Sequence, residues 1–318
     1  MPTADLIAEL RRLTEVAGPP GAEGPVAEAI EAALREHETH RDSIGNVVLP
    51  CSGRPRVLVT AHMDQVAYMV SRVEGESAQC LRVGSPTVDA GRTVPVRVLL
   101  ADGEALDAEL ESLGEEGGVL HGAALDRVAT GDLVVYAAAF EEAGDGRVTS
   151  PSLDDRIGCL LTLHAARALA GERLPVAFAW TTREESEQAG VLRVARDIDP
   201  EVLVAVDITY ATTPGQVRES PVVVGEGPAV TLLDGGMVGH PPLIAAVDRA
   251  ARELGIHWQR EVVSLGTSEA GRVQRTTGIP AVALLVPIEN PHSPDETADM
   301  RDVEQAIALL EATIRALV

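Results

Sequence analysis

Strand-like and helix-like segments alternate along the second half of this chain, and the alternation limits its fold more than any other feature. After Ser150, short apolar runs separated by amphipathic segments predict a series of βα units. Such units imply an open mixed α/β sheet with helices on both faces. The expected strands are Pro175–Thr181, Val202–Val206, Ala229–Leu233, Trp258–Val263 and Ala281–Val286, and the expected helices are 157–170, 187–197, 241–254, 268–276 and 301–317.

The N-terminal segment adds elements of the same kind. Apolar residues at helical spacing predict a helix from Ala4 to Glu15, which a Gly- and Pro-rich stretch at 18–25 ends. A second helix should follow to about His37, and strands are expected at 41–49 and 56–60. The second of these strands delivers His62 at its carboxyl end.

The segment between these two parts has a different sequence pattern. From residue 66 to residue 146, short β-type runs alternate with Gly, Asp and Glu turns, and no long helical pattern interrupts them. We therefore expect a small β-barrel-like domain at 66–146, inserted into a larger domain made of 1–65 and 147–318.

Histidines and carboxylates follow several of the predicted strands. Ligands of open α/β sheets collect beyond the carboxyl ends of the strands, so side chains at these positions should meet in one crevice. Residues this far apart in the sequence cannot form a local metal loop, and only the fold can bring them together. The candidates are His62, Glu184, Glu185, Asp207 and His292 near strand ends, with Asp154 and Asp155 entering from a loop.

This set has the composition that a pair of divalent metal ions needs. Two ions roughly 3.5–4 Å apart need a bridging carboxylate, and each needs further N or O ligands. A bridging Asp with one His and one carboxylate on each ion leaves an open, catalytic site. Asp64 could hold the other ring nitrogen of His62. Of two consecutive glutamates, one can bind metal while the other moves a proton.

Each residue also has an alternative structural role. Paired aspartates before a helix are commonly N-caps, and Glu184 with Glu185 could begin a solvated helix. Asp207 could be a turn residue and His292 a surface histidine. The complete set favours the metal site over these separate readings.

Composition excludes several classes of function. A net charge of −23 argues against binding to nucleic acid or to anionic membranes. All 26 basic residues are Arg, so neither a Lys Schiff base nor a Lys general base is available. We find no apolar run near the roughly 20 residues of a membrane span and no signal peptide. Three widely spaced cysteines favour reduced thiols in a cytoplasmic protein.

Several motifs give the chain a specific resemblance that covers nearly its whole length. In these motifs, and in their order, it resembles the cytoplasmic dinuclear metalloaminopeptidases, which include the tetrahedral (TET), deblocking and glutamyl aminopeptidases. That family also carries a small β-domain at the position of the insertion. The motifs are Asp-Ser-Ile-Gly-Asn (42–46), Ala-His-Met-Asp (61–64), Ser-Leu-Asp-Asp-Arg-Ile-Gly (152–158), Thr-Thr-Arg-Glu-Glu-Ser (181–186), Asp-Ile-Thr-Tyr-Ala-Thr-Thr-Pro-Gly (207–215) and His-Ser-Pro-Asp-Glu (292–296).

The resemblance implies a role for each candidate. Asp154 would bridge two ions, Zn²⁺ or Co²⁺ with Mn²⁺ also suitable, and a bridging hydroxide would be the nucleophile. Glu184 would be the general base, Asp155 the partner of Asp154 across a strained peptide bond, and Asp64 the orienter of His62. The substrates would be peptides with a free N-terminus, and the protein would be a homo-oligomer, from a dimer up to a dodecamer. His62 and Asp207 would complete one metal site, and Glu185 and His292 the other.

Two alternatives and two departures from the family pattern remain. The same metal frame could serve an amidohydrolase acting on acylated amino acids or dipeptides, or the fold could be a non-catalytic scaffold. Cleavage of free against blocked substrates discriminates between them. The first departure is Glu-Glu-Ser-Glu-Gln-Ala-Gly (184–190), where the family has Glu-Glu-Val-Gly-x-x-Gly. The family's Gly-Thr-Asp-Ala loop is here Gly-Thr-Ser-Glu-Ala-Gly (266–271), close to where relatives bind the first side chain. The preferred first residue is therefore open.

Overall fold

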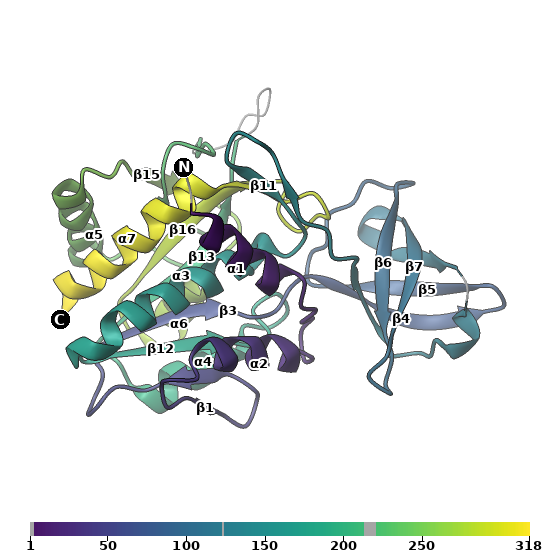
Figure 1. Ribbon diagram of the computed structural model, residues 1–318, viewed down its shortest axis with the longest axis horizontal. Helices are drawn as coiled ribbons and strands as arrows, with labels where there is room; N and C mark the ends of the chain where they lie inside the picture. Colours follow the sequence, from purple (N-terminus) through teal and green to yellow (C-terminus); the bar gives the residue numbers. More distant parts are fainter. Residues whose placement is uncertain (1–2, 123, 213–220) are drawn as a thin grey trace.

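A computed structural model describes residues 3–122, 124–212 and 221–318, and it consists of a large α/β body and a smaller β-barrel (Figure 1). The fold class predicted from the sequence, a mixed sheet between helices with an inserted barrel, is confirmed. Among the described residues, no helix has both the length and the apolar composition that crossing a bilayer requires.

The large body is built on one mixed sheet with parallel strands at its centre. β3 (Val57–His62) lies between β12 (Val176–Thr181) and β13 (Val202–Tyr210), and both neighbours run parallel to it. β13 pairs in parallel with β16 (Ala281–Glu289) on its other side. The remaining strands are β1 (His40–Arg41), β2 (Val47–Leu49), β10 (Glu141–Glu142), β11 (Arg147–Thr149), β14 (Ala229–Leu233), β15 (Gln259–Val262) and β17 (Thr297–Asp299).

Helices cover both faces of this sheet, since each face carries its own apolar cluster. The larger cluster packs under helices α1, α2, α3, α5 and α7, and the smaller under α4 and α6. Both clusters draw on the central strands, which are buried along nearly their whole length. The helices are α1 (Ala4–Thr14), α2 (Gly24–Ala33), α3 (Leu153–Leu169), α4 (Ala189–Ile198), α5 (Pro241–Leu254), α6 (Glu269–Thr277) and α7 (Met300–Leu317), with a 3-10 turn at Ala170–Glu172. Two further 3-10 turns, Gly114–Glu116 and Leu125–Arg127, lie in the inserted segment.

Two central strands are longer than the sequence indicates. β13 was expected to end at Val206 and β16 at Val286, but they stay paired as far as Tyr210 and Ile288. The apolar pattern breaks at Asp207 while the backbone pairing does not, which is why the sequence places the strand end too early. Asp207 therefore lies inside a strand, not after one.

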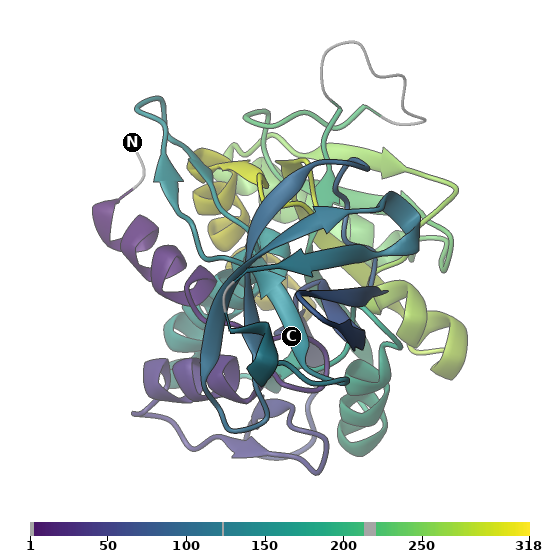
Figure 2. The same cartoon turned by 90° about the vertical axis from the view of Figure 1, so that its right-hand side faces the viewer.

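The smaller body is a closed six-stranded barrel (Figure 2). Its strands run in the order β4-β5-β8-β7-β6-β9, and alternate side chains fill the interior. All six lie within the predicted insertion 66–146, and β10 already pairs with β11 in the large sheet. The barrel strands are β4 (Ala67–Glu74), β5 (Ser77–Val83), β6 (Thr93–Leu99), β7 (Ala105–Ser112), β8 (Gly118–His121) and β9 (Leu133–Tyr136).

Candidate active site

The central parallel strands place three candidate groups at one edge of the sheet. His62 is the last residue of β3, and the Glu184–Glu185 pair follows β12 by a short turn. Asp207 lies near the carboxyl end of β13, so its side chain projects at the same edge. All four line one cavity together with Asp154 and His292.

Asp154 lies between the two histidines. Its Oδ1 is 3.2 Å from Nε2 of His62, and its Oδ2 is 3.1 Å from Nε2 of His292. A carboxylate whose two oxygens face two different imidazoles has the arrangement of a bridging ligand. The same Nε2 of His62 is 3.8 Å from Oδ1 of Asp207, and that of His292 is 3.5 Å from Oε2 of Glu185.

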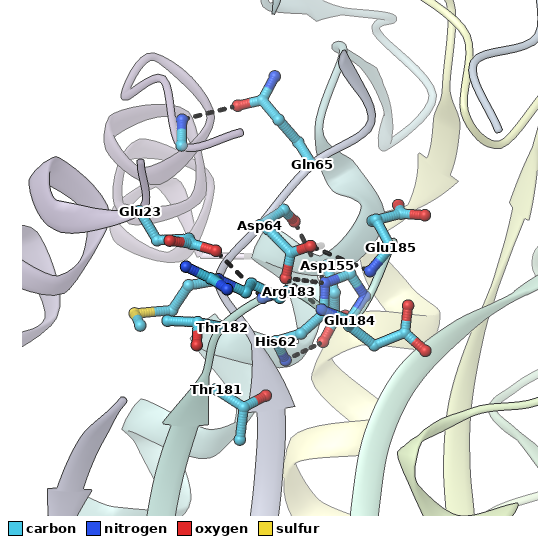
Figure 3. Close-up of polar contacts among 12 residues, drawn as sticks. Glu23, His62, Asp64, Gln65, Asp155, Thr181, Thr182, Arg183, Glu184 and Glu185 are labelled. Atoms are coloured by element: carbon cyan, nitrogen blue, oxygen red, sulfur yellow. Dashed lines mark hydrogen bonds and ion pairs between the residues drawn. The ribbon is translucent and has the colours of Figure 1, made fainter. Parts of the chain in front are cut away.

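Asp64 holds the turn that carries the glutamate pair (Figure 3). Its Oδ1 accepts the backbone N–H of Glu184 at 2.9 Å, and its Oδ2 accepts that of Glu185 at 3.0 Å. Its Oδ1 is also 3.5 Å from Nδ1 of His62, whose ring nitrogen lies 3.2 Å from the carbonyl oxygen of Asp64. One fully buried carboxylate thus positions residues from two strands.

Glu184 projects into the cavity and has a side-chain partner in Gln188. The amide of Gln188 donates to Oε1 of Glu184 at 2.5 Å. Burial raises the pKa of Glu184 to about 8, while the charge of His62 opposes this and that of Asp207 adds to it. A carboxyl group with a pKa near neutrality can both accept and release a proton there.

His292 has a backbone held from several directions. It adopts a left-handed conformation with φ of 65°. Oε1 of Glu296 accepts its N–H at 2.8 Å, and its carbonyl oxygen accepts the N–H of Thr87 at 2.8 Å and the hydroxyl of Tyr136 at 3.2 Å. Thr87 and Tyr136 belong to the inserted segment, so that segment contributes directly to the site.

Asp155 follows Asp154 in the chain, is fully buried, and contacts backbone groups with its side chain. The peptide bond between them is cis. Oδ1 of Asp155 accepts the N–H of Gly158 at 2.8 Å, and Oδ2 accepts the N–H of His62 at 3.3 Å. The position of Gly158 leaves room for this carboxylate, since a Cβ there would lie 2.1 Å from Oδ2.

Buried carboxylates outnumber histidines in the cluster, and this imbalance shifts the pKa values of both kinds of group. Burial raises the pKa of Glu185, Asp155 and Asp207 above their ordinary values. Burial lowers the pKa of His292, but the charges of Glu185 and Asp154 more than offset this and raise it to about 10. Burial would raise the pKa of Asp154, yet the imidazoles of His292 and His62 next to its two oxygens lower it.

An excess of buried negative charge is what divalent cations neutralise. Oδ1 of Asp154 and Oε1 of Glu185 are buried without a hydrogen-bond partner. Two groups of side chains have ligand atoms within 4.8 Å of one another: His62 with Asp155 and Asp207, and His62 with Asp154 and Glu185. These donors are nitrogen and oxygen atoms suited to a catalytic transition metal, so the site fits metal binding.

Two residues inside quoted motifs have site roles that sequence reasoning did not assign. Glu296 accepts the N–H of Asp154 at 3.1 Å besides that of His292, and burial raises its pKa to about 8. Arg156 is fully buried and donates to the carbonyl oxygens of Leu13, Met63 and Val16. The one available signal was the presence of charged residues next to the candidate ligands. Thr213, Pro214 and Gly215, which end one quoted motif, lie outside the described residues.

A family model and several known proteins that are similar to this chain are peptidases. The family described as M42 glutamyl aminopeptidase matches residues 121–309, more than half of the chain. The lysyl aminopeptidase of Pyrococcus furiosus is 27% identical over 88% of this chain and 87% of its own length. Aminopeptidase APDkam598 from Desulfurococcus kamchatkensis has a TM-score of 0.89 at 26% identity, over 98% of this chain and 94% of its own. The TET1 peptidase of Pyrococcus horikoshii has a TM-score of 0.85 at 26% identity, over 96% of this chain and 98% of its own.

The fold, the metal-suited cavity and these relatives define a metal-dependent aminopeptidase, an enzyme that hydrolyses residues from the N-terminus of peptides. More narrowly, the chain belongs to the M42 glutamyl aminopeptidase family. The resemblance noted in its motifs is therefore confirmed.

Proposed function

We propose that this aminopeptidase works with two divalent metal ions, for which Asp154 is the bridging ligand. His62 and Asp207 would complete one site, and Glu185 and His292 the other. The observation that carries the proposal is the position of Asp154, with one oxygen 3.2 Å from His62 and the other 3.1 Å from His292. When bound, the two ions would polarise the amide carbonyl and lower the pKa of the attacking water.

The protein side chains would divide the remaining work. Glu184 takes a proton from the attacking water at a side-chain oxygen and gives it to the nitrogen of the leaving amine. Gln188 orients that carboxyl group through its 2.5 Å hydrogen bond to Oε1. Asp64 fixes the backbone of Glu184 and Glu185, so one glutamate can bind metal while the other stays free. The free α-amine of the substrate would lie against the carboxylates of the cluster.

The test combines metal reconstitution with a matched pair of variants. Chelator-stripped protein receives Zn²⁺, Co²⁺ or Mn²⁺, and initial rates are measured on peptides with free and with acetylated N-termini. Glu184→Gln should retain the metals and lose activity by about 100-fold or more. Glu187→Gln, which alters an exposed side chain three residues away, should retain activity.

Three outcomes would overturn parts of the proposal. Cleavage of acetylated peptides alone would indicate an acylase. Near-wild-type activity of Glu184→Gln would refute its role as the base. Failure of the protein to bind metal would refute the assigned ligands, and counting bound metal in each preparation separates this case from the other two.

Metal identity, assembly and location complete the proposal. Imidazole and carboxylate ligands suit Zn²⁺ or Co²⁺, with Mn²⁺ also possible.

The TET1 peptidase of Pyrococcus horikoshii can assemble into a tetrahedron or a large octahedral shell. By analogy we propose a homo-oligomer, between a dimer and a dodecamer, in which residues 66–146 act as a separate domain that contributes to assembly. A light-scattering mass equal to the monomer would refute assembly. The three free cysteines support a cytoplasmic enzyme.

A further inference from the structure

The cavity that contains the candidate metal ligands extends beyond them toward the edge strands of the sheet. Its volume is about 380 Å³, enough for an amino-acid side chain beside the reacting groups. The part away from the candidate ligands is lined by residues of β13, β14, β15 and the loop 264–268. Nothing in the proposed chemistry uses these residues, so they are free to select the substrate.

Glu261 of β15 is a buried carboxylate in this part of the cavity, with only 6% of its surface exposed. Its Oε1 accepts the hydroxyl of Thr209, and its Oε2 accepts that of Thr231 at 2.7 Å. A carboxylate has about four acceptor positions, so two hydroxyls leave acceptor capacity on both oxygens. Burial raises the pKa of Glu261 by more than the two hydroxyls lower it, and a bound cation would favour the ionised form.

The hydrogen bond to Thr209 indicates how far Glu261 lies from the candidate metal ligands. Thr209 is two residues beyond Asp207 on β13, so both side chains project from the same face of the strand. Two residues along a strand span about 6.6 Å. A group held by Thr209 therefore lies about one side-chain length from the candidate metal ligands.

Asp234 adds a second buried negative group to the same part of the cavity. Its Oδ1 accepts the N–H groups of Gly236 and Met237, each at 2.6 Å. These bonds stabilise the turn at residues 234–237, and the carboxylate of Asp234 lines the cavity. Neither Glu261 nor Asp234 forms an ion pair with Arg or His among the described residues.

The walls of this cavity are partly apolar. Val263, Leu265 and Leu285 line the cavity, and no Arg or Lys is present among its described lining residues. Apolar walls leading to a buried carboxylate match a side chain with a methylene stem and a cationic end. An acidic first side chain would meet two like charges and no cation of the protein in this region.

We propose that Glu261 selects substrates whose first residue is Arg or Lys, with Asp234 supporting the preference. The proposal rests on the proposed function, because it assumes that this part of the cavity receives the first side chain. It assigns a substrate class that the charge of the whole surface could not indicate, since it follows from two residues that face the cavity.

The test compares kcat/KM for p-nitroanilides of Arg, Lys, Leu and Glu on metal-reconstituted enzyme. We expect Arg and Lys substrates to exceed the Leu substrate by at least about 10-fold, a discrimination of about 1.4 kcal/mol, and the Glu substrate to be the poorest. Glu261→Gln retains the shape and both threonine contacts, with one hydroxyl turned so that it accepts from the new amide. It should lower kcat/KM on Arg and Lys by about 10- to 100-fold, mainly through KM, and change the Leu substrate by less than about 3-fold. Glu253→Gln, which alters an exposed acid of α5 outside the cavity, is the control.

A binding measurement makes the result independent of turnover. Titration calorimetry on metal-loaded Glu184→Gln protein should give tighter binding of argininamide than of leucinamide, and the added substitution Glu261→Gln should remove the difference. A wild-type preference for Leu or Glu, or an equal loss on all substrates in Glu261→Gln, would overturn the inference and leave the aminopeptidase mechanism intact. If metal-loaded protein hydrolyses no free-amine substrate, the proposed function is refuted, and with it the assignment of the pocket.

Discussion

The hydroxyl of Tyr136, at the end of the last barrel strand, donates a 3.2 Å hydrogen bond to the backbone carbonyl oxygen of His292. The barrel therefore does more than pack beside the catalytic body, because it fixes the residue proposed to bind the second metal ion. Ser85, from the same inserted segment, places its carbonyl oxygen 3.1 Å from Nδ1 of His292. Ring and backbone of one candidate ligand both depend on the insertion.

Tyr136→Phe should loosen the second metal site. The substitution retains the ring and removes one of the hydrogen bonds that hold His292 at its φ of 65°. We expect metal affinity to fall by roughly 10-fold, as for other outer partners of metal ligands, with about 1 kcal/mol lost in unfolding free energy. Competition with a chelator measures the affinity. Thr130→Val, which alters an exposed hydroxyl elsewhere on the barrel, should leave it unchanged. Equal affinity in Tyr136→Phe and wild type would contradict the role.

Asp64→Asn should disturb the backbone that positions Glu184 and Glu185 without removing a proposed metal ligand. An amide can accept only one of the two N–H groups that Asp64 now accepts from Glu184 and Glu185, because its NH₂ is a donor. We expect kcat/KM to fall by about 10- to 100-fold while the fold persists. Circular dichroism checks the fold and steady-state kinetics the loss. Asp107→Asn, at a side chain that is 95% exposed, is the matched control. Activity within 3-fold of wild type would show that the turn needs no such clamp.

The sequence predicts the central sheet and its ligand candidates for a shared physical reason. Buried strands are read from apolar runs, and a polar residue that ends such a run, as His62 does, stands out. The crevice rule then brings those residues to one edge without any knowledge of the contacts. Their geometry agrees with this expectation, and their roles as metal ligands remain predictions.

Other features of the site depend on contacts between segments far apart in the chain. Glu296 is an unremarkable loop residue until folding places it against the N–H groups of Asp154 and His292. Glu261 lies on a short edge strand, and its contact with Thr209 crosses between strands separated in the sheet order. No periodicity marks such residues, because the partner that gives them a role is not a sequence neighbour.

Gly158→Ala should disrupt the site through Asp155. The added Cβ would lie 2.1 Å from Oδ2 and 2.4 Å from Oδ1 of that carboxylate, and neither it nor the helix can move freely at full burial. We expect loss of bound metal and a destabilisation of about 1–3 kcal/mol, typical of overpacking. Metal content and urea unfolding measure the two effects. Gly24→Ala, where a Cβ would meet nothing within 4 Å, should be neutral. A Gly158→Ala protein with normal metal content would show that Asp155 can be displaced without consequence.

Glu9→Gln should change how stability depends on pH. Glu9 on α1 accepts Arg167 of α3 at 2.8 Å and lies 3.0 Å from Nε2 of His164, and the hydrogen bond from His164 is the main cause that lowers the pKa of Glu9 to about 2. Because this pKa lies below the ordinary 4.5, the contribution of Glu9 to stability is complete above pH 4.5 and disappears as the pH falls toward 2. The group is about half buried, so we expect Glu9→Gln to lose less than about 1 kcal/mol at neutral pH, and the gap from wild type to close across that acid range. Urea unfolding at a series of pH values measures the gap, with Glu15→Gln, an exposed acid just after α1, as the control. A gap that does not change with pH would mean that Glu9 acts by packing and not by its charge.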